Sequence, residues 1–392
     1  MDRDELETEV EEWVEDGIIG RDQAEEILAR YDEDDDSRLA VVISLMGAVL
    51  VGAGVLWYLV GNWEALPRWL RTVLVILAPI GFAGAGDVLA RDRTPRVGHA
   101  LWTLGAAFVG PSLFLLADLW ALEFDLEWLL LAWAALALPA GHVRRSRPTT
   151  ALALFVLAGA VATLEAPTDL PIAVGSLGVI VLALGIRYRV RTERELADAY
   201  RLVGTTVLLA TLLFFAIEDW NYERLALEPS AVALAMGFGT VVAVAGTGYL
   251  GRTGAASRLE VGWAAAGAAA LLVSAASISL VPAFPSALAL LVVHVSVLAV
   301  LVATVAVAVD VASSALVNLA AVGLFVQVVL FLGATIVDAV SGAAALVLSG
   351  LALLALAVGL ERGRRTVLER MRGSEPTGAG NGPFATGDDA EE

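Results

Sequence analysis

Long apolar stretches, separated by short charged or proline-containing breaks, run along the chain from Leu39 to Leu360. A helix needs about 20 consecutive apolar residues to cross the hydrocarbon core of a bilayer, and many of these stretches reach that length. The pattern predicts an all-α fold, a polytopic transmembrane helix bundle of about twelve spans. The spans are expected at residues 39–60, 70–90, 98–118, 127–143, 149–165, 171–188, 200–217, 230–250, 260–281, 286–309, 314–336 and 341–360.

The residues before the first span have a different pattern. One apolar stripe with helical spacing runs through residues 6–14 and a second through residues 24–31. Gly17 lies between them and can take the left-handed conformation that ends a helix. This predicts a small helical hairpin. Two such short helices bury too little surface to be stable alone, so residues 3–31 are expected to pack on the rest of the chain or to bind a cytoplasmic protein partner.

Three segments follow from this division. Residues 1–37 are the acidic cytoplasmic hairpin and its linker, residues 38–361 are the transmembrane bundle, and residues 362–392 are a basic stub followed by an acidic, glycine-rich tail whose composition is typical of disorder. A polar corner at residues 218–221, after the seventh span, matches in position a corner after the first span. This favours a weak six-plus-six parallel repeat, as in some transporters.

The placement of arginine indicates how the bundle is oriented in the membrane. Short cytoplasmic loops are enriched in Arg and Lys, and with the N-terminus inside, 22 of the 25 arginines fall on the inner side. The three on the outer side are Arg68, Arg71 and Arg224. The sequence therefore predicts a multi-pass protein of the plasma membrane with both termini in the cytoplasm.

The amino-acid composition limits the kinds of functional site that the chain can form. Mean hydropathy is +0.77, the net charge is −18, and all 25 basic residues are arginine. Acidic, lysine-free chains of this kind resemble proteins of salt-adapted, haloarchaeal-like organisms, because acidic surfaces stay hydrated when salt screens charge. The chain has no cysteine, which excludes thiolate chemistry. His99 and His142 lack the HExxH-type spacing of a metal site. No metal, cofactor, catalytic residue or nucleic-acid partner is predicted; the bilayer is the expected partner.

A compact motif follows the first span, at Asn62-Trp63-Glu64-Ala65-Leu66-Pro67. Asn62 is placed to cap the carbonyls at the end of the span, Trp63 to anchor at the interface and Pro67 to fix the turn. These three residues are predicted as an outer corner motif.

The opening of the chain resembles a prokaryotic membrane-protein family known only as domain of unknown function 2157. The resemblance covers about the first 150 residues and implies a membrane location without a known chemistry. Asp118 stands where the family pattern would have Gln, which removes support for a shared role at that position. The matching residues are Trp13-Val14, Gly17-Ile18-Ile19, Asp22-Gln23-Ala24, Ile27, Gly47, Gly52, Gly54, Gly61-Asn62-Trp63, Leu66-Pro67, Gly105 and Gly110.

Polar residues at membrane depth are the candidates for a functional site. No Asp, Glu or Arg is expected near the middle of a span, so the spans are predicted to be nearly free of buried charge. The exceptions are neutral. His294 and Gln327 are expected at similar depth on the tenth and eleventh spans, and Asn318 nearer the inner end. They are either interhelical hydrogen-bond partners or a polar spot on a substrate path.

Three classes of function are open on this basis. The absence of charge at membrane depth and the N-terminal hairpin favour a non-enzymatic membrane sensor or assembly platform. The twelve spans and the repeat favour a transporter or lipid flippase with a site at the bilayer midplane. An enzyme acting on a lipid-linked substrate is the third class. It would need carboxylates and arginines that converge at one membrane face, and Asp87, Arg91 and Asp92 meet this requirement poorly.

Overall fold

The computed structural model describes residues 9–14, 16–24, 50, 54, 57–58, 61–91, 95–164, 170–190, 194–217, 231–279 and 286–339. The chain divides into two compact units, Met1–Leu74 and Val75–Glu392. Each unit is described by itself.

The first unit contains the segment predicted to form the N-terminal hairpin. Residues 9–14 and 21–24 are helical, and Gly17 between them has a φ of 69°, the left-handed conformation that glycine adopts without strain. Val10 and Ala24 are the buried centre of the hairpin, with Trp13, Val14 and Ile19 packed around them. This core is small, and its packing on a further surface or a partner stays a prediction.

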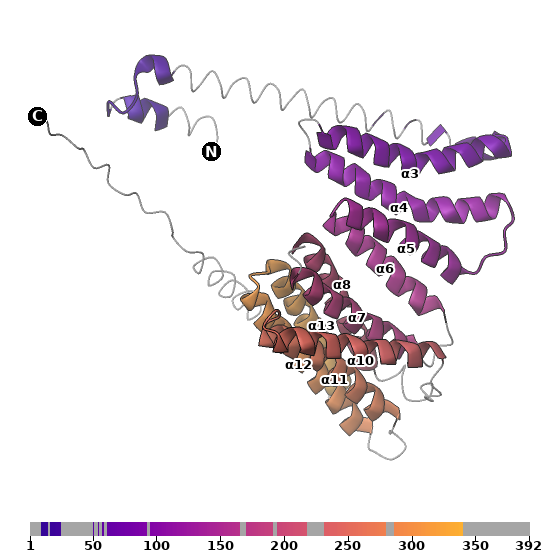
Figure 1. The fold of residues 1–392 in the computed structure, drawn as a ribbon, viewed down its shortest axis with the longest axis vertical. Coiled ribbons are helices and arrows are strands. Elements are labelled where there is room, and N and C mark those ends of the chain that lie inside the picture. Colours follow the sequence, from indigo (N-terminus) through magenta and orange to yellow (C-terminus); the bar gives the residue numbers. More distant parts are fainter. Residues whose placement is uncertain are drawn as a thin grey trace, which may run out of the picture. The chain divides into compact units, whose positions relative to one another are not determined.

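Ten α-helices follow the corner helix η1 (Trp63–Ala65) in the described part of the chain (Figure 1). No described residue is in a strand. The helices are α3 (Arg68–Arg91), α4 (Pro95–Leu119), α5 (Leu126–Val143), α6 (Arg147–Thr163), α7 (Leu170–Val190), α8 (Arg194–Phe215), α10 (Ala231–Arg252), α11 (Arg258–Ser279), α12 (Ser286–Asp310) and α13 (Ser314–Ala339).

Nine of these described helices are long and apolar enough to cross a membrane, and α6, with 17 residues, is a shorter apolar helix. They correspond in order to the second to eleventh predicted spans. Most of the first predicted span, residues 39–60, lies outside the described residues, as do the twelfth span at 341–360, the second corner at 218–221 and the tail from residue 362. The all-α polytopic fold is confirmed, and the total of twelve spans stays a prediction.

Glycine sets the distance between α7 and α8. A Cβ atom on Gly204 of α8 would lie 2.5 Å from the backbone nitrogen of Leu182 and 2.8 Å from the carbonyl oxygen of Gly178, both on α7. Only a residue without a side chain allows the two backbones to approach so closely, which is how membrane helices gain packing contacts without a hydrophobic driving force between them. The same holds between α5 and α6, where a Cβ on Gly141 would lie 2.9 Å from the nitrogen of Thr150.

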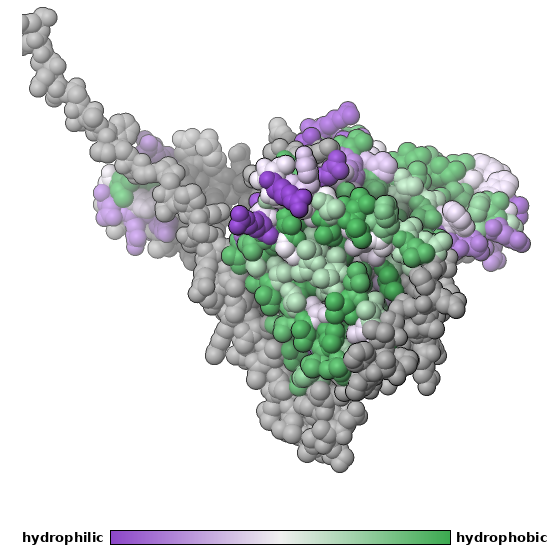
Figure 2. Space-filling model, turned by 60° about the horizontal axis from the view of Figure 1, so that its bottom comes forward, coloured by the Kyte–Doolittle hydropathy of each residue, from purple (hydrophilic) through white to green (hydrophobic). Residues whose placement is uncertain are grey.

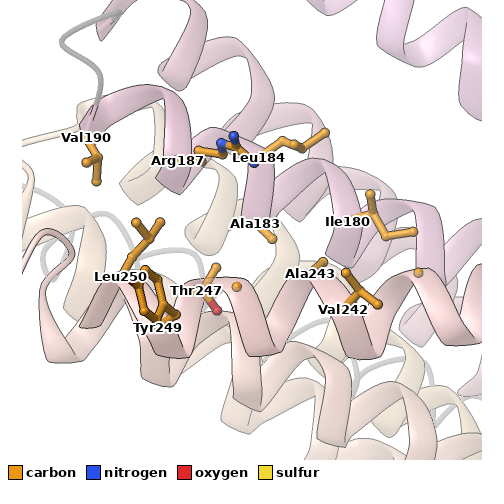
Figure 3. A pocket seen from close by; sticks show the side chains of 12 residues that line it. Ile180, Ala183, Leu184, Arg187, Val190, Val242, Ala243, Thr247, Tyr249 and Leu250 are labelled. Carbon is orange, nitrogen blue, oxygen red and sulfur yellow. The ribbon is translucent and has the colours of Figure 1, made fainter. Parts of the chain in front are cut away.

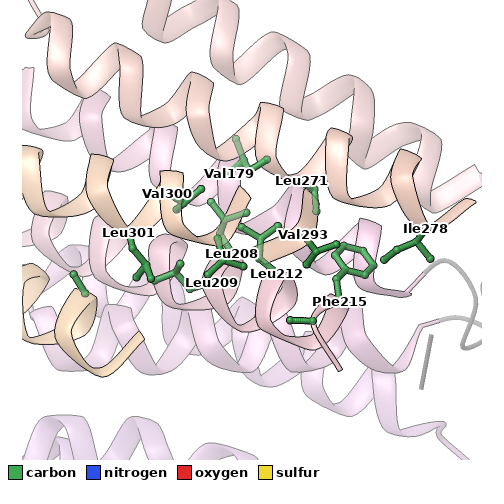
Figure 4. Packing of buried hydrophobic residues seen from close by; sticks show 14 residues of the cluster. Val179, Leu208, Leu209, Leu212, Phe215, Leu271, Ile278, Val293, Val300 and Leu301 are labelled. Atoms are coloured by element: carbon green, nitrogen blue, oxygen red, sulfur yellow. The ribbon is translucent and has the colours of Figure 1, made fainter. Parts of the chain in front are cut away.

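The largest apolar core joins α7, α8, α11, α12 and α13 (Figure 4). Leu208, Leu212 and Phe215 of α8 meet Val293 and Val297 of α12, and the exposed fraction of each is 1% or less. The branched side chains of α12 fill the space beside the leucines of α8. The centre of this part of the bundle is therefore closely packed.

Large apolar side chains also cover the outer surface. On α10, Leu234, Phe238 and Val241 are each more than 60% exposed, and Figure 2 shows apolar residues spread broadly over one face of the described helices. A soluble protein rarely exposes a contiguous apolar patch of this kind. The lipid tails of a bilayer are the solvent in which such a surface is stable.

Candidate functional site

His294 of α12 and Gln327 of α13 form a buried hydrogen bond. The Nε2 amide of Gln327 donates to Nδ1 of the His294 ring at 2.6 Å. Since Nδ1 accepts, the neutral ring carries its proton on Nε2. That Nε2 atom and Oε1 of Gln327 are buried without a hydrogen-bond partner among the described residues. The Phe331 ring stands edge-on to the imidazole at 5.3 Å.

Asn318 does not join this pair. It lies nine residues before Gln327 on the same helix, roughly 13 Å away along the axis at 1.5 Å per residue, and its side chain is exposed. The structure thus brings together two of the three polar residues singled out in the apolar spans. Whether they serve a substrate or only join two helices stays a prediction.

The corner motif lies in the first unit and is tied by its own side chains. Asn62 donates through Nδ2 to the carbonyl oxygen of Tyr58 at 2.8 Å, which satisfies a carbonyl at the end of the preceding turn. Trp63 begins η1, and the carbonyl of Pro67 accepts from the Leu70 N–H at 3.0 Å in the first turn of α3.

Sequence reasoning overlooked the arginine that closes this corner. Arg71 donates through Nε to the carbonyl of Leu66 at 2.8 Å and lies over the Trp63 ring at 6.0 Å. The sequence pattern identifies Arg71 only as one of three outer arginines. These contacts give the corner a structural explanation, and a functional role for Asn62, Trp63 and Pro67 remains a prediction.

The structure contains a buried ion-pair cluster that the sequence pattern did not predict. Arg201 of α8 and Glu260 of α11 are both 2% exposed and form a salt bridge. Arg189 of α7 reaches the same carboxylate oxygen at 2.7 Å. The expectation of spans nearly free of buried charge is therefore wrong for α8 and α11, although both residues lie within two turns of a helix start.

Glu260 has a second task at the start of α11. Its Oε2 accepts from the Ser257 N–H at 3.1 Å, and its own N–H donates to Ser257 Oγ at 3.2 Å. This reciprocal pair is a capping box, and the spacing Ser-x-x-Glu before an apolar run is visible in the sequence. The sequence therefore predicts this helix start. It does not predict the contacts of Glu260 with two arginines that lie 59 and 71 residues away in the chain.

A second polar cluster joins α5, α7 and α8. Nδ1 of His142 donates to the carbonyl of Leu138 at 2.8 Å. Its Nε2 faces the hydroxyls of Tyr188 and Tyr200 at 3.2 and 3.1 Å. This histidine is thus a hydrogen-bond hub between three helices. The described residues include no group of three or more His, Asp or Glu side chains able to hold a metal ion.

These polar clusters gather at one end of the second unit, where α3, α5, α7, α10 and α12 finish and α4, α6, α8, α11 and α13 begin. Arg144 pairs there with Asp87 and lies over the Trp102 ring at 4.7 Å. Arg147 pairs with Asp198 at 3.1 Å. Charge is thus concentrated at helix ends and is sparse in the described middle of the bundle.

Described residues of the second unit line three cavities. A groove of about 590 Å³ runs between α7 and α10 (Figure 3). A polar cavity of about 440 Å³ at the charged helix ends is lined by Arg147, Asp198, Arg201 and residues 311–316. A third, of about 370 Å³, is apolar and lies among α6, α7 and α8. Neither His294 nor Gln327 lines any of the three.

Several long apolar helices, an apolar outer surface and charge confined to helix ends define a multi-pass membrane protein. Residues 11–150 match the family model described as "Predicted membrane protein (DUF2157)". The resemblance that the opening of the sequence suggested is confirmed over that segment. No curated protein and no solved structure matches the chain.

Proposed function

We propose that the protein is a non-enzymatic sensor or assembly platform of the plasma membrane, with both termini in the cytoplasm and an N-terminal hairpin that binds a cytoplasmic protein. The observation that carries the proposal is the packing around the His294–Gln327 pair. Both residues are 6% exposed, and Val293 and Val297 beside them on α12 belong to the closely packed core.

A transporter or flippase needs a different interior. Its substrate site lies near the bilayer midplane, in a space lined by polar groups and open to water from one side at a time. Ser274 of α11, a polar residue within an apolar helix, has no exposed surface. The three cavities described above lie at helix ends or on the flanks of the helices and do not include it. Close packing at this depth favours a scaffold over a path.

The distribution of charge supports the orientation. Arg144, Arg189 and Arg258 lie at the same end of the second unit, as expected for a cytoplasmic side enriched in arginine. The hairpin supports the docking role, because Ile18 at its turn is 68% exposed although it is apolar. An exposed apolar side chain on a small, weakly stabilised element is a suitable contact for a partner.

Water access to the interior tests the proposal. The natural chain has no cysteine, so Ser274→Cys introduces a single thiol at the packed depth. In lipid nanodiscs, where both membrane faces are accessible, we expect a water-soluble maleimide to leave it unmodified while it labels Ala255→Cys in the exposed connection between α10 and α11. Labelling of both thiols at similar rates would show that water reaches the interior, which would contradict the platform function and favour a transporter.

The docking role has its own test. A photo-crosslinking amino acid at Ile18 in the full-length chain should trap one discrete protein partner in cells, and the same amino acid at Ala255 should not. The adduct should disappear when Val10→Asp disrupts the buried centre of the hairpin. Absence of an adduct at Ile18, or one that survives Val10→Asp, would remove the hairpin from the proposal.

A further inference from the structure

The groove between α7 and α10 widens from one end to the other. At its narrow end Thr240 Oγ1 donates to the carbonyl of Ser176 at 3.4 Å, and a Cβ on Gly239 would lie 3.0 Å from Ile180 Cδ1. Two turns further along α10, a Cβ on Gly246 would meet no atom within 4 Å. The helices thus touch near Gly239 and leave open space beside Gly246.

The lining of this groove is almost entirely apolar. Small residues form part of it, namely Ala183 of α7 with Ala243 and Gly246 of α10, and Leu184 and Val242 line it as well (Figure 3). Val242 is 54% exposed, so the groove opens on the outer surface that faces the bilayer. An apolar, outward-facing groove of this kind has the shape and polarity of a site for an acyl chain.

Among the described residues, Arg187 is the only charged one that lines the groove. Its side chain is exposed, and no described residue forms a salt bridge or hydrogen bond with it. It lies in the last turn of α7, at the wide end of the groove and on the arginine-rich side of the bundle. Tyr249, also in the lining, is 66% exposed, and its amphipathic ring suits the depth of the headgroups.

We propose that this groove binds an anionic phospholipid, with one acyl chain along α7 and α10 and its phosphate at the guanidinium of Arg187. A basic residue at the mouth of a groove between membrane helices is a recurrent way to hold a negatively charged headgroup. The long side chain of Arg187 can extend along the helix to keep its charge in the interface. The site does not depend on the sensor or platform function and would exist in a transporter equally.

A second copy of the chain fits the groove less well. In an equivalent bundle in the same membrane orientation, the described carboxylates at that depth, Asp87, Asp198 and Glu260, are already paired with Arg144, Arg147 and Arg201. A lipid phosphate, by contrast, brings an unpaired negative charge to Arg187. Charge complementarity therefore favours lipid.

Lipid binding to the purified full-length chain tests the site. Native mass spectrometry would count bound phosphatidylglycerol and phosphatidylcholine with identical acyl chains. We expect the wild type to bind phosphatidylglycerol about fivefold more tightly, the value of one basic contact with an anionic headgroup. Arg187→Gln should abolish this preference, and Gly246→Leu, which builds into open space, should weaken the binding of both lipids about tenfold.

Arg252→Gln is the matched control. Arg252 ends α10 at the same side of the bundle but does not line the groove, so its loss removes the same charge and should leave the fivefold preference intact. Equal effects of Arg187→Gln and Arg252→Gln would reduce the site to general electrostatic attraction and overturn the proposal. Unchanged lipid binding by Gly246→Leu would do the same, as would a dimer of the chain that forms only when lipid is removed from the groove.

Discussion

Arg201 on α8 and Glu260 on α11 form an ion pair in which each side chain is 3% exposed. The carboxylate also receives Arg189 and the Ser257 N–H, so its oxygens are well satisfied. A buried pair of this quality adds little net stability over an apolar pair, but loss of one partner leaves the other charge buried and uncompensated. The cluster therefore joins α7, α8 and α11 strongly only while it is complete.

Glu260→Gln should lower the free energy of unfolding by about 3 kcal/mol, because it leaves the buried Arg201 without its counter-charge. Titration of the protein in mixed micelles with a denaturing detergent would measure the change. Arg147→Gln is the control: its partner Asp198 is 42% exposed, and an exposed pair contributes less than about 1 kcal/mol. An equal decrease in the free energy of unfolding for the two variants would mean that Glu260 is solvated and not buried in the membrane.

Gly204→Ala should destabilise the bundle by roughly 1–3 kcal/mol, the usual effect of overpacking. The new Cβ would lie 2.5 Å from the backbone nitrogen of Leu182, so α7 and α8 must separate. Gly237→Ala on α10 makes the same chemical change where a Cβ meets nothing within 4 Å, and it should be neutral or slightly stabilising through helix propensity. Thermal unfolding in detergent micelles distinguishes the two, and a drop in melting temperature for Gly237→Ala alone would contradict this packing.

The helices were predictable because the length of an apolar run needs no knowledge of tertiary contacts. The span expected at 171–188 is Leu170–Val190 in the structure, and the one expected at 314–336 is Ser314–Ala339. His294 and Gln327 could also be found, since a polar residue within an apolar span is conspicuous.

The inward faces of the helices were not predictable. In a bilayer both the lipid-facing and the core-facing sides of a helix are apolar, so periodicity does not mark the buried side. Val241 is 63% exposed and Val297 is fully buried, yet both are valines in similar surroundings in the sequence. The meeting of Arg201 and Glu260 and the open space beside Gly246 depend on which faces meet, and only the folded chain determines that.

His294→Leu should cost about 0.6 kcal/mol, the average contribution of a hydrogen bond between membrane helices, and the same is expected of Gln327→Leu. Both residues already carry a polar atom without a partner among the described residues, so the double variant removes both of these groups. It should be more stable than the sum of the single variants predicts. A double-mutant cycle of unfolding free energies measures this coupling. Strictly additive effects would show that the hydrogen bond contributes nothing in the membrane.

The orientation of the bundle can be measured directly because the chain has no cysteine. Glu123→Cys lies in the exposed connection between α4 and α5, and Ala255→Cys in the one between α10 and α11. With both termini in the cytoplasm these connections lie on opposite sides, so a membrane-impermeant maleimide added to intact cells should modify only Glu123→Cys. Lysis should make Ala255→Cys equally reactive. Modification of Ala255→Cys alone in intact cells would reverse the predicted topology.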